Sequence, residues 1–144
     1  MRYLALVAFW LVTVVGTQAA PLSLRESLGM FETGANQPGS GMADRVRGKS
    51  GEVSRFQILP SVWHRYTSST EYDNPEVAWY VTQRILSERI TSFRSATGRD
   101  PNALEIYLLW NKPGSFQQAG FVAQRVKVTY LKRAERFANL WQSS

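Results

Sequence analysis

The hydrophobic residues of this chain recur mostly at helical spacing. The clearest case is the last twenty or so residues, where apolar side chains form one stripe and basic side chains take the other side. The apolar stripe consists of Val122, Val126, Tyr130, Ala134, Phe137 and Trp141, and the basic side carries Arg125, Lys127, Lys132, Arg133 and Arg136. No segment shows the apolar–polar alternation of a half-buried strand. We therefore expect a mainly α-helical domain with a small irregular or β-like segment near residues 50–60.

Capping residues and glycines predict where three earlier helices begin and end. A helix start needs a side chain that accepts a hydrogen bond from a free backbone N–H, and proline is tolerated in the first turn. The three start signals are Ser23-Leu24-Arg25-Glu26, which fits a capping box, Asn74-Pro75 and Asp100-Pro101. The first helix is expected to end near Glu32, before Gly34, and the second near Thr97. The third covers residues 104–110.

Residues 34–54 contain five glycines and a proline and are predicted to form a long loop. Within it, residues 43–50 read A-x-x-x-x-G-K-S, a relaxed form of the phosphate-binding loop. That loop works only between a strand and a helix, whose backbone N–H groups cradle the phosphate. Because neither element is predicted here, we interpret the match as a coincidence.

Residues 1–20 are typical of a secretory signal peptide. Arg2 precedes an apolar run over residues 4–15, and small residues lead to Ala19-Ala20. The run is shorter than the roughly 20 residues that span a bilayer, and an uncleaved membrane anchor is the alternative. Cleavage after Ala20 leaves 16 Lys+Arg against 11 Asp+Glu, because Arg2 is lost from 17 basic residues. We expect a periplasmic or secreted, monomeric domain of charge +5 with no stable membrane span.

The absence of cysteine and the single histidine exclude several kinds of site. They exclude a disulfide scaffold, a Cys-ligated zinc ion, a thiol nucleophile and a metal centre with several His ligands. No G-x-S-x-G turn surrounds a serine, so we interpret His64 as a hydrogen-bonding or surface residue and expect no metal or cofactor. The positive charge favours an anionic partner. For an exported protein an anionic cell-wall polymer explains it better than nucleic acid, although binding of nucleic acid through the last helix is a further hypothesis.

Glu32 lies where the first helix meets the glycine-rich loop, so its side chain can project into a cleft. A glutamate buried beside apolar groups has its ionised form disfavoured and its pKa raised. Such a carboxyl suits general acid catalysis near neutral pH.

Three segments, in order, resemble motifs of the lytic transglycosylase and goose-type lysozyme superfamily. Residues 31–36, Phe-Glu-Thr-Gly-Ala-Asn, resemble the E-S-G-x-N motif of that family. Residues 54–61, Ser-Arg-Phe-Gln-Ile-Leu-Pro-Ser, resemble G-L-M-Q-I-M-P-S, and residues 109–114, Leu-Trp-Asn-Lys-Pro-Gly, resemble A-Y-N-x-G-P-G. The resemblance implies a lysozyme-like domain over residues 21–144 that cleaves the β-1,4 bond from N-acetylmuramic acid to N-acetylglucosamine in peptidoglycan.

The resemblance also implies roles for individual residues. Glu32 would be the general acid, Gln57 and Asn111 would border the sugar-binding groove, and Phe56 would shield the glutamate. The aromatic residues that would lie near the groove or behind it are Tyr107, Trp110 and Trp63. In the transglycosylases the glutamate then acts as base while the 6-hydroxyl of muramic acid closes an anhydro ring. A lysozyme-like variant would instead position water with a second carboxylate, for which the candidates are Asp44 and Glu52.

The chain departs from the family motifs at several positions. Thr33 replaces a serine, Ser54 a glycine, Arg55 an apolar residue and Trp110 a tyrosine. Arg55 beside the cleft would hold Glu32 ionised, or it would contact an anionic peptide stem. Ser54, Arg55 and Trp110 motivate an alternative to the enzyme, a non-catalytic module that binds peptidoglycan without cutting it.

Overall fold

A computed structural model describes residues 20–143, so the predicted signal peptide lies, except for Ala20, outside the described residues. The described part is mainly helical, which confirms the predicted fold class. Its helices are α1 (Leu24–Thr33), α2 (Pro60–Trp63), α3 (Pro75–Thr97), α4 (Ala103–Asn111), α5 (Pro113–Gln118) and α6 (Val128–Gln142), with 3-10 turns at Ala43–Arg45 and Ala123–Arg125. Between residues 20 and 143, strand-like pairing is confined to one antiparallel bridge from Val53 to Ile58, in the predicted β-like segment.

Two of the three predicted capping signals are correct and one is wrong. The capping box of Ser23 opens α1, and the Asn74 side chain caps α3. Helix α4 matches the predicted range of residues 104–110 to within one residue at each end, but its cap is Asn102, which forms a capping box with Glu105, and not Asp100. Asp100 instead pairs with Arg94 near the end of α3.

The last helix, α6, begins later than the apolar stripe predicts. Gly120 and Phe121 both have positive φ values, 67° and 57°, which interrupt helical geometry. The Phe121 ring packs edge-on against Phe93 and Phe116, so burial of this ring accompanies the break. Val122 and Val126 of the stripe therefore flank a 3-10 turn, and α6 starts only at Val128.

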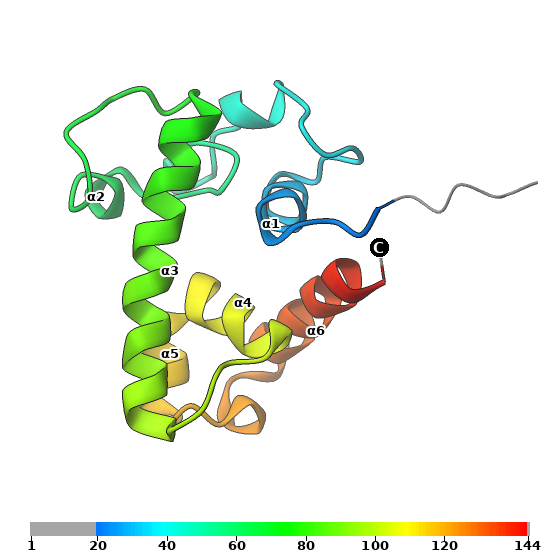
Figure 1. Ribbon diagram of the computed structural model, residues 1–144, viewed down its shortest axis with the longest axis vertical. Coiled ribbons are helices and arrows are strands. Elements are labelled where there is room, and N and C mark those ends of the chain that lie inside the picture. Colours follow the sequence, from blue (N-terminus) through cyan, green and yellow to red (C-terminus); the bar gives the residue numbers. More distant parts are fainter. Residues whose placement is uncertain (1–19, 144) are drawn as a thin grey trace, which may run out of the picture.

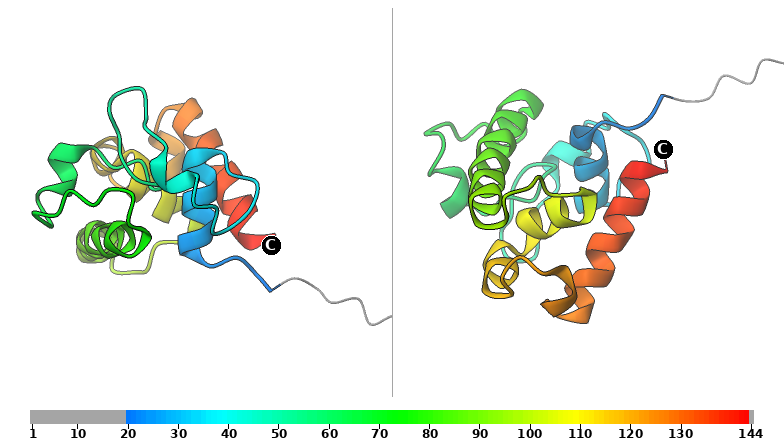
Figure 2. Two further views of the ribbon diagram at one scale, coloured as in Figure 1. Left: turned by 90° about the horizontal axis from the view of Figure 1, so that it is seen from above. Right: turned by 60° about the horizontal axis from the view of Figure 1, so that its bottom comes forward.

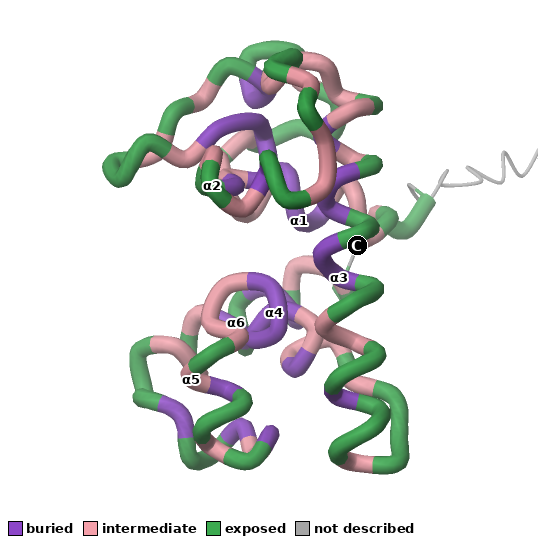
Figure 3. The backbone as a smooth tube through the Cα atoms, turned by 90° about the vertical axis from the view of Figure 1, so that its left-hand side faces the viewer, coloured by how far each residue is buried: buried purple, intermediate pink, exposed green. Residues whose placement is uncertain are grey.

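Helix α3 runs the length of the molecule and connects its two ends (Figure 1). Helices α1 and α2 and the loops around them lie toward one end, and α4, α5 and α6 lie toward the other (Figures 1 and 3). Buried segments occur at both ends, and the two further views show α6 running beside α1 and α4 (Figures 2 and 3). Helix α3 thus connects α1 and α2 at one end with α4 and α5 at the other.

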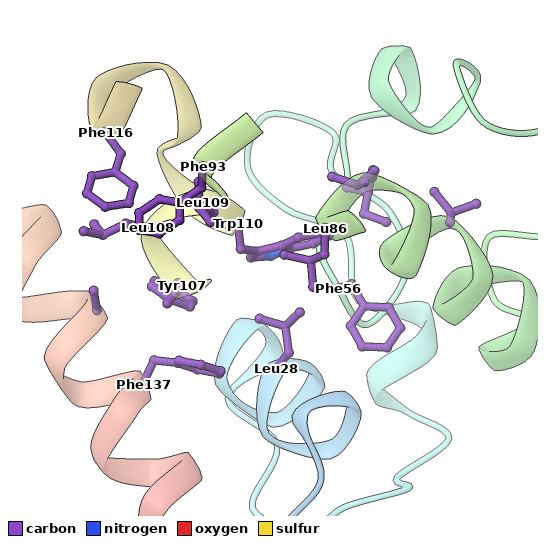
Figure 4. Packing of buried hydrophobic residues seen from close by; sticks show 14 of the residues in the cluster. Leu28, Phe56, Leu86, Phe93, Tyr107, Leu108, Leu109, Trp110, Phe116 and Phe137 are labelled. Atoms are coloured by element: carbon purple, nitrogen blue, oxygen red, sulfur yellow. The ribbon is translucent and has the colours of Figure 1, made fainter. Parts of the chain in front are cut away.

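A cluster of three aromatic rings joins α1, α4 and α6. Tyr107 stacks on Phe137 with ring centroids 4.8 Å apart, and Phe31 meets both rings edge-on at 5.1 and 5.6 Å. Figure 4 shows Tyr107 and Phe137 beside Leu28 of α1. Because aromatic pairs add to the free energy gained by burying their area, this cluster fixes the end of α1 relative to the C-terminal helix. Within residues 20–143, none of the helices is both apolar enough and long enough to cross a membrane.

Candidate active site

The three motif-like segments line one pocket of about 330 Å³. The end of α1, the turn around residues 52–58, α2, α3 and the junction of α4 with α5 all contribute to it. The lining residues are Glu32, Glu52, Gln57, Ile58, Leu59, Val62, Ile85, Arg89, Trp110, Asn111, Lys112 and Pro113. Its volume is in the range of small-molecule sites, and four of its residues are charged.

Glu32 occupies the last turn of α1 and is nearly buried, with 7% of its side chain exposed. Gly34, in the left-handed conformation, ends the helix just beyond it. The Tyr107 hydroxyl donates to Glu32 Oε1 at 2.6 Å, and Arg133 Nε donates to the Tyr107 oxygen at 2.7 Å. A second nitrogen of Arg133, Nη2, lies 3.5 Å from Glu32 Oε2. Helices α1, α4 and α6 therefore each place one member of this polar group.

The surroundings of Glu32 raise its pKa above the usual value for a glutamate. Burial is the largest cause, because it disfavours the ionised carboxylate, and the nearby charge of Glu52 acts in the same direction. The hydrogen bond from Tyr107 and the charge of Arg133 lower the pKa but do not cancel the effect of burial. Burial and the neighbouring Glu32 also raise the pKa of Tyr107, so this phenol stays protonated as a donor.

Gln57 reaches the pocket from a tight turn in a left-handed conformation. Its φ is 52°, and Ser54, which stands where the family motif has glycine, has a φ of 63°. The Gln57 amide nitrogen donates to the carbonyl oxygens of Ser54 at 2.9 Å and Val46 at 3.2 Å. Since both amide hydrogens are engaged, Oε1 is the atom of Gln57 that remains for a ligand.

Glu52 lies in the pocket, wrapped by the turn that carries the G-K-S sequence. Ser50 N donates to the Glu52 carboxylate at 2.9 Å. A Cβ atom on Gly48 would lie 2.0 Å from Glu52 Oε2 and 2.7 Å from Gln57 Oε1, so only glycine leaves room for these groups. The backbone N–H of Ser50 therefore binds Glu52 rather than a phosphate. Within the described residues, no strand precedes this turn and no helix directly follows it. Both facts support our interpretation of the phosphate-loop match as a coincidence.

Asn111 and Trp110 enter the pocket at the end of α4. Trp110 is 8% exposed and its ring centroid lies 5.8 Å from the Arg89 guanidinium carbon. Lys112 and Pro113 continue the pocket wall at the junction, where α5 begins directly after α4.

Comparisons with protein-family models, curated proteins and solved structures found no match to this chain. The family resemblance therefore depends on the motif residues alone. Between residues 20 and 143, no cluster of three or more acidic or His side chains is arranged to hold a metal ion.

Three aromatic residues to which the resemblance gave a place at the groove or behind it lie in the protein interior. Phe56 is fully buried, packs against Trp79 at 5.6 Å and does not line the pocket. Tyr107 is 1% exposed and reaches the site only through its hydroxyl. Trp63, for which the sequence left two positions open, is buried and donates from Nε1 to Ser69 O at 2.7 Å.

The structure corrects the predictions for Asp44 and Arg55. Arg55 donates from Nε and Nη2 to the two Asp44 oxygens at 2.5 and 2.7 Å, and both residues are buried. Neither lines the pocket, so Arg55 neither holds Glu32 ionised nor contacts a ligand there, and Asp44 is no second carboxylate for it. Bidentate pairing of an arginine with a carboxylate is strong, and here it occurs away from the pocket. His64, as predicted, makes hydrogen bonds, to Tyr72 and to Thr67 O.

Three charged residues of the site were missed from the sequence. Arg133 was assigned to the outer, basic side of the last helix, yet it lies four residues before Phe137 and so shares a face with it. That spacing is a signal that could have placed Arg133 beside α1.

Arg89 lies four residues from both Ile85 and Phe93, and Lys112 lies within the motif-like segment 109–114, so the sequence could have indicated both positions. That they line one pocket is decided by the folded chain, in which α3 meets the α4–α5 junction.

Proposed function

We propose that this protein is a lysozyme-like enzyme that cleaves peptidoglycan glycan strands at the β-1,4 bond between N-acetylmuramic acid and N-acetylglucosamine. The observation that carries this proposal is the convergence of three distant segments on one pocket. Glu32, Gln57 and Asn111 come from the three motif-like segments and line the same pocket. The positive φ of Ser54 adds support, because it explains why a glycine would suit that position of the motif.

Glu32 acts as the general acid in this proposal. Burial raises its pKa, so a larger fraction of the carboxyl carries a proton near neutral pH than in a solvated glutamate. Because Arg133 donates to the Tyr107 oxygen, the one hydrogen of that phenol is directed at Glu32 Oε1. The transferable proton then resides on Oε2 and passes to the glycosidic oxygen as the bond to the leaving sugar breaks.

Two routes complete the cleavage. In the first, the ionised Glu32 takes a proton from the 6-hydroxyl of muramic acid, whose oxygen closes an anhydro ring. In the second, Glu52 positions a water molecule that attacks the sugar, as in glycosidases with two carboxyl groups. Glu52 lines the pocket and Asp44 does not, so Glu52 is the carboxylate available for the second route.

Digestion of purified cell walls tests the proposal. The wild-type protein is expected to release soluble muropeptides and the Glu32→Gln variant to release at least a hundredfold less, the size of effect typical of a general acid. Glu135→Gln, the same change at an exposed site on α6, is the matched control. Anhydro-muropeptides detected by mass would indicate the first route, and reducing ends the second. Equal release by wild type and Glu32→Gln would overturn the proposal.

One observation favours a second candidate function, a module that binds peptidoglycan without cutting it. The positive charge of Arg133, 3.5 Å from Glu32 Oε2, favours the ionised carboxylate, which is no acid. Sedimentation of the wild-type protein with cell walls, together with no release of muropeptides over the same period, would establish this alternative. In both cases we propose an exported, monomeric protein that needs no cofactor and whose partner is peptidoglycan rather than nucleic acid.

A further inference from the structure

The pocket contains an arginine whose charge has no ion-pair partner. Among the ion pairs formed within residues 20–143, none includes Arg89. Arg89 extends from α3, and its Nη1 donates to the carbonyl oxygens of Leu109 and Trp110 at 2.8 and 2.7 Å. This contact caps the C-terminal end of α4, where cations are favoured.

The hydrogen bonds at the end of α4 use only part of the donor capacity of Arg89. A guanidinium has five N–H groups, and both hydrogen bonds that Arg89 makes start from Nη1. Nε and Nη2 are left for other acceptors, in a side chain that lines the pocket. Burial also lowers the pKa of Arg89, because loss of water disfavours the charged guanidinium.

No neighbouring carboxylate of the described residues forms an ion pair with Arg89. Among the groups around it, Tyr66 has the largest effect and favours the charged guanidinium, Arg65 opposes that charge and Glu88 favours it. The Glu88 carboxylate also accepts a hydrogen bond from the Tyr66 hydroxyl.

Of the two pocket carboxylates, Glu32 is held by Tyr107 and Arg133. Glu52 accepts a hydrogen bond from Ser50 N and is in none of the ion pairs formed within the described residues.

Lys112 brings a second cation to the pocket. It follows the residues whose carbonyls Arg89 binds, and its Nζ lies 4.9 Å from the centre of the Tyr130 ring. Lys112 is in none of the ion pairs formed within the described residues either. Two cations without carboxylate partners thus share one pocket with Gln57 and Asn111.

We propose that Arg89 and Lys112 form a carboxylate-binding subsite within this pocket, so that the protein selects acidic glycans over neutral ones. This inference deepens the proposed function and rests on it for the sugar part of the ligand. A planar guanidinium binds a carboxylate through two parallel hydrogen bonds, and an ammonium adds a point charge. The carboxylate comes either from the lactyl group of muramic acid or from a peptide stem attached to it.

Binding measurements in the Glu32→Gln background test this subsite without cleavage of the ligand. Three ligands of matched length are compared by calorimetry: strands with intact peptide stems, strands freed of stems that expose the lactyl carboxylate, and uncharged N-acetylglucosamine oligomers. At least one acidic ligand is expected to bind tenfold or more tightly than the neutral oligomer, and the one preferred identifies the source of the carboxylate. Equal affinity for all three ligands would overturn the proposal.

Substitutions test whether Arg89 and Lys112 cause the preference for acidic ligands. Arg89→Gln and Lys112→Gln are each expected to weaken binding of the acidic ligand about tenfold, and binding of the neutral oligomer less than threefold. Arg84→Gln, an equal loss of charge at an exposed position of α3, is the control and is expected to leave both affinities unchanged. If Arg89→Gln fails to fold because α4 loses its cap, Arg89→Lys and Lys112→Gln decide. Equal losses for acidic and neutral ligands would refute the subsite.

The outcome separates the two proposals. Selective binding of acidic strands by a protein that releases no muropeptides would leave the subsite standing and overturn the enzyme. Cleavage of cell walls by a protein that binds neutral and acidic oligomers equally would do the reverse.

Discussion

Glu32 and Asp44 are both buried carboxyl groups, yet their neighbours differ in kind. Asp44 is held by two hydrogen bonds from one guanidinium, at 2.5 and 2.7 Å. Glu32 is held by a neutral phenol at 2.6 Å, and its cation is 3.5 Å away. The short bidentate pair of Asp44 with Arg55 stabilises the fold. At Glu32 the cation is more distant, and burial is the main influence on the pKa.

The raised pKa of Glu32 should make the free energy of unfolding depend on pH. Because the pKa of Glu32 is raised in the folded state, the folded protein binds more protons than the unfolded chain between the ordinary and the raised value. Ionisation of Glu32 therefore lowers the free energy of unfolding as pH rises through that interval. We expect Glu32→Gln to be more stable relative to wild type at pH 8 than at pH 4, as measured by urea unfolding.

The two proteins share every other titrating group, so the change in their difference isolates Glu32. Glu135→Gln, at an exposed position, measures the effect of the same substitution on the surface. A difference that is constant between pH 4 and pH 8, or that falls, would contradict the raised pKa.

A buried ion pair joins the 3-10 turn at Ala43–Arg45 to the turn that carries Gln57. Asp44 lies in the 3-10 turn at Ala43–Arg45, and Arg55 lies in the turn bounded by the Val53–Ile58 bridge. The Arg55 chain also packs against α1, since a Cβ on Gly29 would lie 3.1 Å from Arg55 Cδ. Close packing of Arg55 on Gly29 and its ion pair with Asp44 thus position the turn that carries Gln57.

Loss of one partner should be costly, because it leaves a buried charge without compensation. We expect Asp44→Asn to lower the free energy of unfolding by roughly 3–5 kcal/mol. Asp100→Asn, which breaks the exposed pair with Arg94, is the control and is expected to have a much smaller effect, since surface ion pairs contribute little. Denaturant titrations of both variants measure the two costs, and similar losses would show that the Asp44–Arg55 pair is not structurally special.

At the scale of the whole molecule, α6 contributes to the surroundings of Glu32, which lies on α1. Helix α6 supplies Phe137 to the aromatic cluster and Arg133 to the group around Glu32. Figures 1 and 2 show α6 next to α1 although almost the whole described chain separates them. Folding of the C-terminal segment therefore controls the environment of a residue near the N-terminal end of the described chain.

Removal of the central ring of this contact should affect the whole molecule. We expect Phe137→Ala to lower the free energy of unfolding by about 3–5 kcal/mol, because it leaves a cavity among fully buried side chains. Val128→Ala, at a position of α6 that is 62% exposed, is the control and is expected to change stability little. Urea unfolding followed by tryptophan fluorescence measures both, and a loss below 1 kcal/mol for Phe137→Ala would mean that α6 docks weakly.

The sequence predicted those features whose cause lies within a few residues. The capping box of Ser23, the Asn74 cap and the glycines after α1 and α3 were correct, because each depends on hydrogen bonds between near neighbours. The cap of α4 was wrong because two local signals, at Asp100 and Asn102, competed, and the start of α6 was wrong because burial of Phe121 accompanies a break in the helix.

The sequence by itself determined the mainly helical fold, since periodic apolar residues must bury one face. It also indicated Glu32, Gln57 and Asn111 as candidates, and the tertiary structure decided that they share a pocket. Only the tertiary structure assigned the charges: Arg55 to Asp44, Arg133 to Tyr107 and Glu32, and Arg89 to the end of α4. The reason is physical: local spacing can put a side chain on the buried face of its helix, but its partner depends on which distant segments pack together.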